Sequence, residues 1–490
     1  MSWSKETSRQ RIKDAAKAVE KLEVVKLSRE VDLYSIPLEK AYLVDGVHIY
    51  VDITNARELL GTTDFEGERC HKRILRFLHL YQRMVHFAFA GTNAFKVDFQ
   101  NERLHFVVFK PLDDAIARVI RAVALVKLLL DVVSKANEKH EDLPNAKLAV
   151  GIDTGLALAV NNGTRSDREP LFIGEPANRA AKVIGKNKEG VFLTPTAAKV
   201  LGLQLQPNQS VYPLNPKQMD WCADQAQLGS DVDALVEKWK EELKETPLAD
   251  IEFSRPTPPL KDLDIDTLTP ANSRRSELLT LFADIDGFTK FVSARMGDLK
   301  KAAETVRVLH VVRKELRDVL HDHDGLKIRY IGDCLHGVMV VGTSQTTDAP
   351  TTVVKAALCA GAMRDAFGLV QEELPAAQEL GLAIGLEYGP VSITRLGVKN
   401  DRDRCVIGRA VYEAEGRQSS CNGKQTAFGP EAVKAAKDEI GGLLDSNNKA
   451  IDLTHTKVEL HLQVTEKAQK VAGTMVPLPP NVSLPRPHCR

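Results

Sequence analysis

The segment LFADIDGFTKF, residues 281–291, determines how the rest of the chain is interpreted. A mostly apolar run from Leu278 to Ala283 predicts a buried strand that ends in Asp284. A Gly-containing turn follows and leads into an amphipathic segment. A carboxylate at the end of a strand, followed by the N–H groups that open a helix, suits a metal-bound phosphate.

A second segment, KIRYIGDCLHGV at residues 327–338, contains two alternating runs that meet at Gly332 and Asp333. This pattern predicts a hairpin with a carboxylate at its tip. If the strand and the hairpin are neighbours in one sheet, Asp284 and Asp333 meet at one point. Together with the phosphates of a nucleotide, two such ligands form a site for Mg²⁺ or Mn²⁺. Taken separately, Gly-Asp also fits ordinary turn chemistry, and Asp284 also fits a helix cap.

Bulk properties narrow the class of protein. A chain of 490 residues predicts two or three domains, and its 66 basic and 66 acidic residues argue against a dedicated nucleic-acid or membrane-surface protein. Seven scattered Cys residues without a CxxC pair indicate reduced thiols. The first residues lack the apolar core of a signal peptide, and the apolar stretch 116–133 carries charges that exclude a membrane span. We therefore expect a cytoplasmic protein with no nucleic-acid or membrane partner.

The two halves of the sequence carry the same landmarks in the same order. Asp52 stands 122 residues before Gly174, and Asp284 stands 124 residues before Gly408. The second acidic position follows the first after 50 residues in one half and 49 in the other. This register predicts a tandem duplication in which each copy is a strand–helix–hairpin–helix–strand unit of the α+β class.

The motifs FADIDGFT and IRYIGDCLHGV, in this order, resemble those of the class III nucleotidyl cyclases, whose two metal-binding Asp residues lie in them. The resemblance implies an α+β fold with two ferredoxin-like cyclase domains that form an intramolecular pseudo-dimer. We expect a helical lead-in (1–37), a first cyclase domain (38–204), a linker with a helix and a Pro-rich spacer (205–273), a second, metal-binding cyclase domain (274–436) and a C-terminal extension (437–490).

The resemblance also assigns the metal site. Asp284 and Asp333 match the metal pair, with Ile285 as a further expected ligand, and they imply two Mn²⁺ or Mg²⁺ ions. The first copy keeps Asp52 but has Glu102 in the second position. Because Mg²⁺ tolerates little change in geometry, we expect that site to be degenerate.

The transition-state residues are expected from the other copy. Asn178 and Lys182 follow Gly174 by four and eight residues, on one face of a helix, and match the Asn and Arg of the family. The equivalent positions after Gly408 hold Tyr412 and Gly416. Lys182 keeps the charge of Arg but not its planar fork. Further substrate contacts are expected from the turn amides of Ile285, Phe288 and Thr289 and from Lys399.

The residues expected to contact the base match neither purine pattern of the family, which is Lys and Asp for adenine and Glu and Cys for guanine. The two positions hold Asp98 and Leu171, although a two-residue shift of the hairpin would substitute Lys96 for Asp98. A carboxylate accepts from an exocyclic amine, which slightly favours CTP over UTP. The degenerate site would present Arg329 and Cys405.

A tandem cyclase without a sensor domain and with non-purine base positions resembles the pyrimidine cyclases of bacterial anti-phage (Pycsar) systems. The resemblance implies conversion of CTP or UTP into a 3′,5′-cyclic nucleotide and pyrophosphate, and a second messenger that acts on a separate effector protein. A monomeric pseudo-dimer or a homodimer would suffice. The alternatives are an adenylate or guanylate cyclase and a catalytically dead nucleotide-binding homologue.

Overall fold

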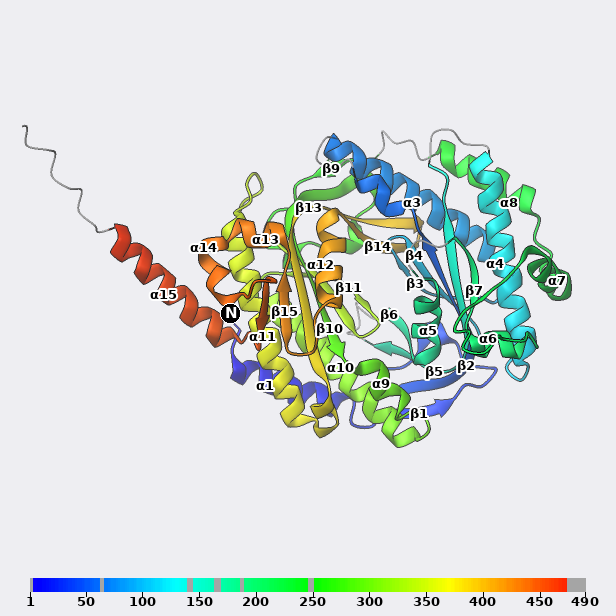
Figure 1. Cartoon of the computed structure of the whole chain (residues 1–490), viewed down its shortest axis with the longest axis horizontal. Helices are drawn as coiled ribbons and strands as arrows, with labels where there is room; N and C mark the ends of the chain where they lie inside the picture. Colours follow the sequence, from blue (N-terminus) through cyan, green and yellow to red (C-terminus); the bar gives the residue numbers. More distant parts are fainter. Residues whose placement is uncertain are drawn as a thin grey trace, which may run out of the picture.

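The computed structural model describes residues 3–61, 66–138, 144–162, 169–185, 189–245 and 251–473, and it contains two eight-stranded sheets (Figure 1). The first has the order β3-β4-β2-β5-β7-β8, with β1 paired to β2 and β6 paired to β5. The second has the order β11-β12-β10-β13-β15-β16, with β9 paired to β10 and β14 paired to β13. The second sheet repeats the first strand for strand, so the predicted fold of two α+β cyclase-like domains is confirmed.

The strands of the first sheet are β1 (Glu23–Lys26), β2 (Lys40–Ile53), β3 (Phe95–Gln100), β4 (Arg103–Val108), β5 (Leu148–Asn162), β6 (Glu169–Ile173), β7 (Gly190–Leu193) and β8 (Tyr212–Pro213). Those of the second are β9 (Phe253–Ser254), β10 (Ser273–Asp286), β11 (Leu326–Ile331), β12 (Cys334–Met339), β13 (Gly381–Val398), β14 (Asp401–Ile407), β15 (Gln425–Phe428) and β16 (Lys449–Ile451).

The helices are α1 (Lys5–Ala18), α3 (Glu68–Phe89), α4 (Ala115–Glu138), α5 (Glu175–Val183), α6 (Pro195–Val200), α7 (Pro216–Ala226), α8 (Val232–Lys244), α9 (Phe288–Ser293), α10 (Leu299–Asp322), α11 (Ala349–Glu373), α12 (Arg409–Ser419), α13 (Pro430–Ala435), α14 (Lys437–Ile440) and α15 (His455–Gly473). Short 3₁₀ turns include η2 (Ala56–Leu60) and η5 (Ile265–Thr267).

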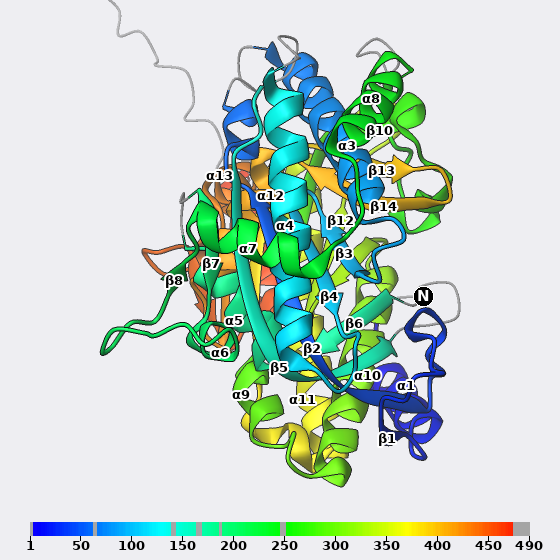
Figure 2. The same ribbon diagram turned by 90° about the vertical axis from the view of Figure 1, so that its right-hand side faces the viewer.

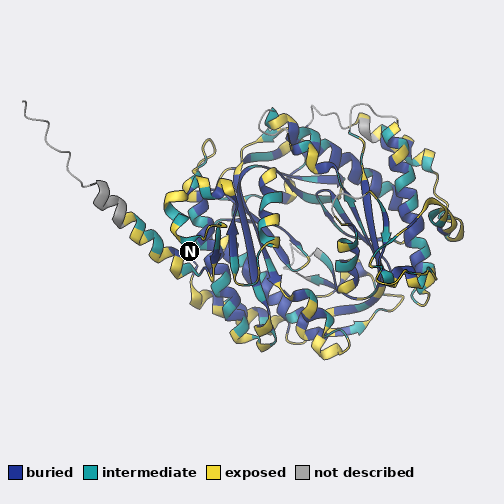
Figure 3. Cartoon of the chain, in the orientation of Figure 1, coloured by how far each residue is buried: buried dark blue, intermediate teal, exposed yellow. Residues whose placement is uncertain are grey.

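The helices divide each sheet into a covered face and an interface face. α3 and α4 pack on the first sheet and α10 and α11 on the second, each pair forming a large apolar core with it. α5 and α12 lie between the two sheets (Figure 1), and α4 lies on the outer side of the first sheet, at the front of Figure 2. In Figure 3 the strands are mostly dark blue, the colour of buried residues, and the exposed residues are concentrated on the outer helices. Because β10 is covered on both faces, residues 278–283 are all buried and, apart from Thr280, apolar.

Several boundaries differ from the sequence-based expectation. In the expected linker (205–273), β8 belongs to the first sheet, β9 belongs to the second, and α7 and α8 pack on α4. β10 continues past Asp284 to Asp286, because β13 pairs with it as far as Gly381. The lead-in is not wholly helical, since β1 pairs in parallel with β2. In the expected C-terminal extension, β16 completes the second sheet and α15 packs on α11. The Pro-rich residues 477–480 lie outside the described residues.

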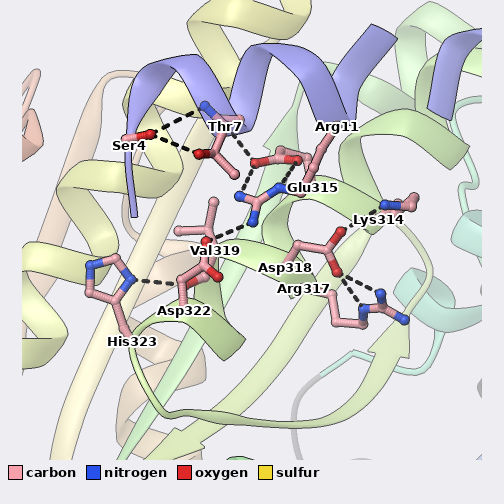
Figure 4. A network of polar contacts seen from close by, with 11 residues as sticks. Ser4, Thr7, Arg11, Lys314, Glu315, Arg317, Asp318, Val319, Asp322 and His323 are labelled. Atoms are coloured by element: carbon pink, nitrogen blue, oxygen red, sulfur yellow. Dashed lines mark hydrogen bonds and ion pairs between the residues drawn. The ribbon is translucent and has the colours of Figure 1, made fainter. Parts of the chain in front are cut away.

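Helix α1 joins the N-terminal end of the chain to the second half (Figure 4). The Arg11 guanidinium donates to both carboxylate oxygens of Glu315, at 2.7 and 3.1 Å, and to Asp322 at 2.7 Å. Ser8 Oγ also donates to Glu315, at 2.6 Å. Glu315 is buried on α10, so these contacts fix α1 against the second domain. Among the described residues, no helix combines the length and the apolar character that crossing a membrane requires.

Candidate active site

A cleft of about 860 Å³ lies between the two halves of the chain. We call it the active cleft. Its lining includes nearly all of the residues singled out in the sequence, from both halves: Asp98, Leu171, Asn178 and Lys182 from the first, and Asp284, Ile285, Phe288, Thr289 and Asp333 from the second. The fold thus collects at one place residues that lie far apart in the sequence.

The strand and hairpin that carry the two expected metal ligands are neighbours. β10 pairs with β12, with Ala283 opposite Leu335, so Asp284 and Asp333 meet at the same edge of the sheet. Gly332, which precedes Asp333, has a φ of 61°, a left-handed conformation that glycine adopts without strain. The local turn chemistry read from the sequence therefore places the second carboxylate beside the first.

The two carboxyl groups repel each other in a partly buried place. Burial and the neighbouring Asp286 raise the pKa of Asp284 to about 6. Burial and the charge of Asp284 raise the pKa of Asp333 well above its usual range. Within the described ranges neither forms an ion pair, and Asp284 accepts a hydrogen bond from Gln418 Nε2 at 3.3 Å. Because a bound cation would relieve this repulsion, the pair fits a divalent metal ion.

The protein side chains alone do not complete a metal coordination sphere. In the part of the chain that the structure describes, no cluster of three or more His, Cys, Asp or Glu residues suits a metal. Main-chain oxygens, water and substrate phosphates would have to supply the other ligands, as is common for Mg²⁺. The Ile285 side chain is buried in the core, so the expected role of Ile285 is open only to its main-chain carbonyl.

The equivalent acids of the first half are neutralised by arginines. Arg103 lies 3.4 Å from Asp52, and Arg57 Nε donates to Glu102 Oε1 at 2.9 Å. The hydroxyl of Tyr412, from the other half, donates to Glu102 Oε2 at 2.9 Å. We call these five residues the closed interface site. Two guanidinium groups supply the positive charge that a metal would bring, which is a physical reason to expect no ion there.

The two expected transition-state residues lie on α5 and face the active cleft. Asn178 Nδ2 donates to Thr289 Oγ1 at 2.8 Å, a direct contact between the two halves. Lys182, one turn further along, is exposed and forms no hydrogen bond or ion pair with any described residue. A substrate would therefore have to separate Asn178 from Thr289 to use both side chains, whereas Lys182 is accessible as it stands.

The turn from β10 into α9 also lines the cleft. Gly287 adopts a left-handed φ of 85°, and α9 begins at Phe288. The Phe288 ring is buried in the core, so a phosphate would meet the main-chain N–H groups of this turn rather than the ring. This agrees with a main-chain role for Phe288, whereas Thr289 also offers its hydroxyl.

The base position needs revision, because the Asp98 carboxylate already has a partner. Arg329 donates to Asp98 Oδ1 and to the main-chain oxygen of Phe99, both at 2.6 Å. Asp98 and Arg329 occupy equivalent positions in the two copies, each four residues before the second acidic position. Arg329, expected in the degenerate site, thus lines the active cleft instead.

The hairpin register distinguishes Asp98 from Lys96. Both hairpins carry a bulge at the same place, between Lys96 and Asp98 in one and between Lys327 and Arg329 in the other. The Lys96 amine is held by Asp401 and Asp403, at 2.8 and 2.9 Å, and Lys96 does not line the cleft. Of the two alternatives, Asp98 is the one that lines the active cleft.

Known proteins resemble this chain over nearly its whole length. A model of the adenylate and guanylate cyclase catalytic domain matches residues 271–464. A Pseudomonas aeruginosa protein named uridylate cyclase is 43% identical over 93% of this chain and 90% of its own length. A second uridylate cyclase, from a Rhizobium species, is 36% identical over 88% of this chain and 86% of its own. The chain belongs to the class III nucleotidyl cyclases.

A solved structure agrees with this assignment. It is described as a class III adenylyl cyclase-like ATP-binding protein from Pseudomonas aeruginosa, and it superposes with a TM-score of 0.89 at 42% identity. It covers 94% of this chain and 99% of its own. The nucleotidyl cyclase described here therefore shares its complete two-domain architecture with a known relative. The family model matches the half that keeps Asp284 and Asp333.

One expected substrate residue of the cyclase does not reach the site. Lys399 is exposed in the turn between β13 and β14 and does not line the active cleft. Asp284 pairs with Ala383 near the other end of β13, roughly 50 Å of strand away at 3.3 Å per residue. We therefore leave Lys399 out of the proposed site.

Other cleft residues were not identified from the sequence. Arg313 of α10 lies with its guanidinium 3.9 Å from the centre of the Tyr330 ring, and its charge lowers the pKa of Asp333, against the larger effect of burial. Tyr50 stacks on His105, with ring centres 4.2 Å apart. Gln418 lies on α12. These residues lie within regular elements, where no turn or motif distinguishes them from core or surface residues.

Proposed function

We propose that this cyclase converts UTP into 3′,5′-cyclic UMP and pyrophosphate. The observation that carries the proposal is the active cleft, which joins Asp284 and Asp333 of one half to Asn178 and Lys182 of the other. The names of the two curated relatives support a pyrimidine substrate, and uracil in particular.

We further propose that Asp284, Asp333 and the main-chain oxygen of Ile285 hold two Mn²⁺ or Mg²⁺ ions. Bound there, the ions would polarise the triphosphate and acidify the ribose 3′-hydroxyl. The proton of the 3′-hydroxyl passes to water, the 3′-oxygen bonds to the α-phosphorus, and the bond between that phosphorus and the pyrophosphate oxygen breaks. Asn178 orients the ribose and the α-phosphate, and Lys182 places a positive charge where negative charge develops. Main-chain amides from Ile285 to Thr289 hold the other phosphates.

The choice of UTP over CTP rests on the pair of Asp98 and Arg329. The amine of cytosine needs an acceptor, but Oδ1 of Asp98 already accepts from Arg329. Arg329 also donates to the main-chain oxygens of Phe99 and Arg404, and we propose that a further N–H of this guanidinium donates to the O4 carbonyl of uracil. The apolar side chain of Leu171 would contact the edge of the base. This reverses the slight preference for CTP that the sequence alone gave.

The role in the cell is part of the same proposal. A cyclic pyrimidine nucleotide would act as a second messenger on a separate effector protein, in defence against phage and in the cytoplasm. One chain supplies both sides of the active cleft, so a monomer suffices for catalysis. Binding of ATP is the second candidate function, because the solved relative is described as ATP-binding.

The test is a substrate panel. Purified protein is incubated with ATP, GTP, CTP or UTP in the presence of Mn²⁺, and the products are read by mass spectrometry. We expect cyclic UMP from UTP as the main product. Cyclic AMP as the main product would favour the purine alternative, and no cyclic product from any of the four would contradict the proposal.

A further inference from the structure

We propose that the closed interface site is a positioning device for the active site. In this inference, Tyr412 and Glu102 hold α12 in place, so that Gln418 keeps the Asp284 carboxylate oriented for metal binding. It rests on the proposed function for its kinetic test, but it makes a separate claim about how the two sites of the pseudo-dimer are connected.

The closed interface site is tightly linked across the two halves. Glu102 is only 4% exposed, and its two oxygens accept from Tyr412 and Arg57, both at 2.9 Å. The Arg57 guanidinium also lies 4.2 Å from the centre of the Tyr412 ring, in a cation–π contact. Burial and the charge of Glu102 raise the pKa of Tyr412 well above its usual range, so the hydroxyl remains a donor.

The turn that carries Glu102 binds the other half as well. Asn101 has a left-handed φ of 51°, close to the 61° of Gly332 in the equivalent turn. Its side chain donates to the main-chain oxygen of Val406 at 2.9 Å and accepts from the Val406 N–H at 3.3 Å. In the second copy, the hairpin tip presents Asp333 to the cleft. In the first copy, the equivalent tip binds strand β14 of the second copy instead.

Helix α12 connects this anchor to the metal carboxylates. Tyr412, Glu415 and Gln418 follow one another every three residues, so each side chain is a neighbour of the next along the helix surface, and Tyr412 and Gln418 are about 120° apart around the axis. Tyr412 contacts Glu102, and Glu415 lies 3.6 Å from Arg57 and also lines the active cleft. Gln418, about 9 Å along the axis from Tyr412 at 1.5 Å per residue, donates to Asp284. A rotation or shift of α12 at Tyr412 would thus displace the amide at Asp284.

The repeat makes the division of roles clear. Tyr412 occupies the helix position that Asn178 occupies in the other copy, four residues after the equivalent glycine. One copy uses this position in the active cleft, and the other uses it to bind the opposite half. The substitutions that closed the second site would therefore have created contacts that hold the active site in position.

A double-mutant cycle with Tyr412→Phe and Gln418→Leu tests the inference. Each single change is expected to lower kcat about tenfold, as for one hydrogen bond to a charged group, and to leave the KM for UTP within about twofold. The double variant is expected to be no slower than the slower single variant, because both changes interrupt one linkage. Losses that multiply in the double variant, or an unchanged kcat in Tyr412→Phe, would overturn the inference.

Two further variants separate positioning from general damage. Tyr212→Phe removes a hydroxyl that accepts from Gln218 at 3.0 Å outside the active cleft, and we expect wild-type kcat. Glu102→Gln keeps one acceptor oxygen for the two donors of Tyr412 and Arg57, so one contact is lost, and it is expected to lower kcat, though by less than Tyr412→Phe does. If Tyr212→Phe lowers kcat as much as Tyr412→Phe does, the inference is overturned.

A binding measurement makes the test independent of turnover. Free Mn²⁺ is followed by electron paramagnetic resonance during titration of each variant. We expect Tyr412→Phe and Gln418→Leu to weaken Mn²⁺ binding by similar factors. Weaker binding in Gln418→Leu alone would overturn the linkage. If the wild-type protein makes no cyclic nucleotide, the proposed function fails, and the Mn²⁺ titration still decides the positioning claim.

Discussion

At the scale of single residues, two pairs of acids in equivalent positions have opposite electrostatic surroundings. Asp52 and Glu102 are each matched by an arginine. Asp284 and Asp333 have raised pKa values and form no ion pair within the described ranges. An uncompensated pair of carboxyl groups costs stability unless a ligand neutralises it. This contrast locates the expected metal site in one half.

We expect Asp333→Ala to abolish turnover without loss of folding. The change removes one of two proposed metal ligands, and a loss of at least about 10²–10³-fold in kcat is expected, as when one group that stabilises charge in the transition state is removed. Because burial raises the pKa of Asp333, its charge opposes folding, and its loss should leave the protein folded. The measurements are kcat with UTP and the melting temperature. Unchanged activity would contradict the metal assignment.

The raised pKa of Asp284 makes a prediction about pH. The folded-state pKa of about 6 exceeds the ordinary 3.8, so ionisation of this carboxyl opposes folding. The metal-free protein should therefore lose stability as the pH rises from about 4 to about 6. In EDTA at pH 7.5 we expect Asp284→Asn to melt about 2–4 °C above the wild type, with most of that gain absent at pH 4. A variant that melts at or below the wild-type temperature at pH 7.5 would count against this account.

At the scale of elements, the two equivalent hairpins meet through Asp98 and Arg329. We expect Arg329→Ala to reduce the UTP:CTP ratio of kcat/KM by about tenfold, because Asp98 becomes available to an amine and the donor for a carbonyl is lost. Asp98→Asn leaves the guanidinium in place and should keep the preference for UTP. Competition assays with both nucleotides measure the ratio, and an unchanged ratio in Arg329→Ala would rule out this base contact.

Helix α1 gives a prediction about stability. Arg11→Ala leaves the buried carboxylate of Glu315 without its main partner, and we expect a loss of about 2–4 kcal/mol in the free energy of unfolding. Arg29→Ala, which removes an exposed ion pair with Asp113, is the matched control and should change stability by less than about 1 kcal/mol. Urea denaturation measures both. Equal effects would show that α1 is not held by this network.

The elements that could be predicted were those with local signals. Turn residues such as Gly332 and the constant spacing of the two copies are visible in the sequence itself. The hairpins and the repeat could therefore be predicted. The partners of Asp98 and Glu102 come from the other half, and no local pattern specifies them. Strand β1, four residues in a charged segment, was missed because only its pairing with β2 makes it a strand.

At the scale of the whole molecule, the two halves are complementary rather than equal. One half brings Asp284 and Asp333 to the active cleft, and the other brings Asn178 and Lys182. The second of the two possible sites is filled by contacts between the halves. A single chain therefore has the parts for one nucleotide site. The sequence predicted this asymmetry through the substitutions at Glu102 and Tyr412, but not the contacts that these residues form.

The most direct test of the single composite site is a crystal structure with Mn²⁺ and a UTP analogue that cannot cyclise, examined by anomalous diffraction. We expect one nucleotide per chain, with manganese peaks beside Asp284 and Asp333 and none beside Asp52 and Glu102. The base should lie toward Arg329 and Leu171, and the α-phosphate near Lys182. Manganese at Asp52 and Glu102, or a nucleotide bound outside the active cleft, would contradict the account.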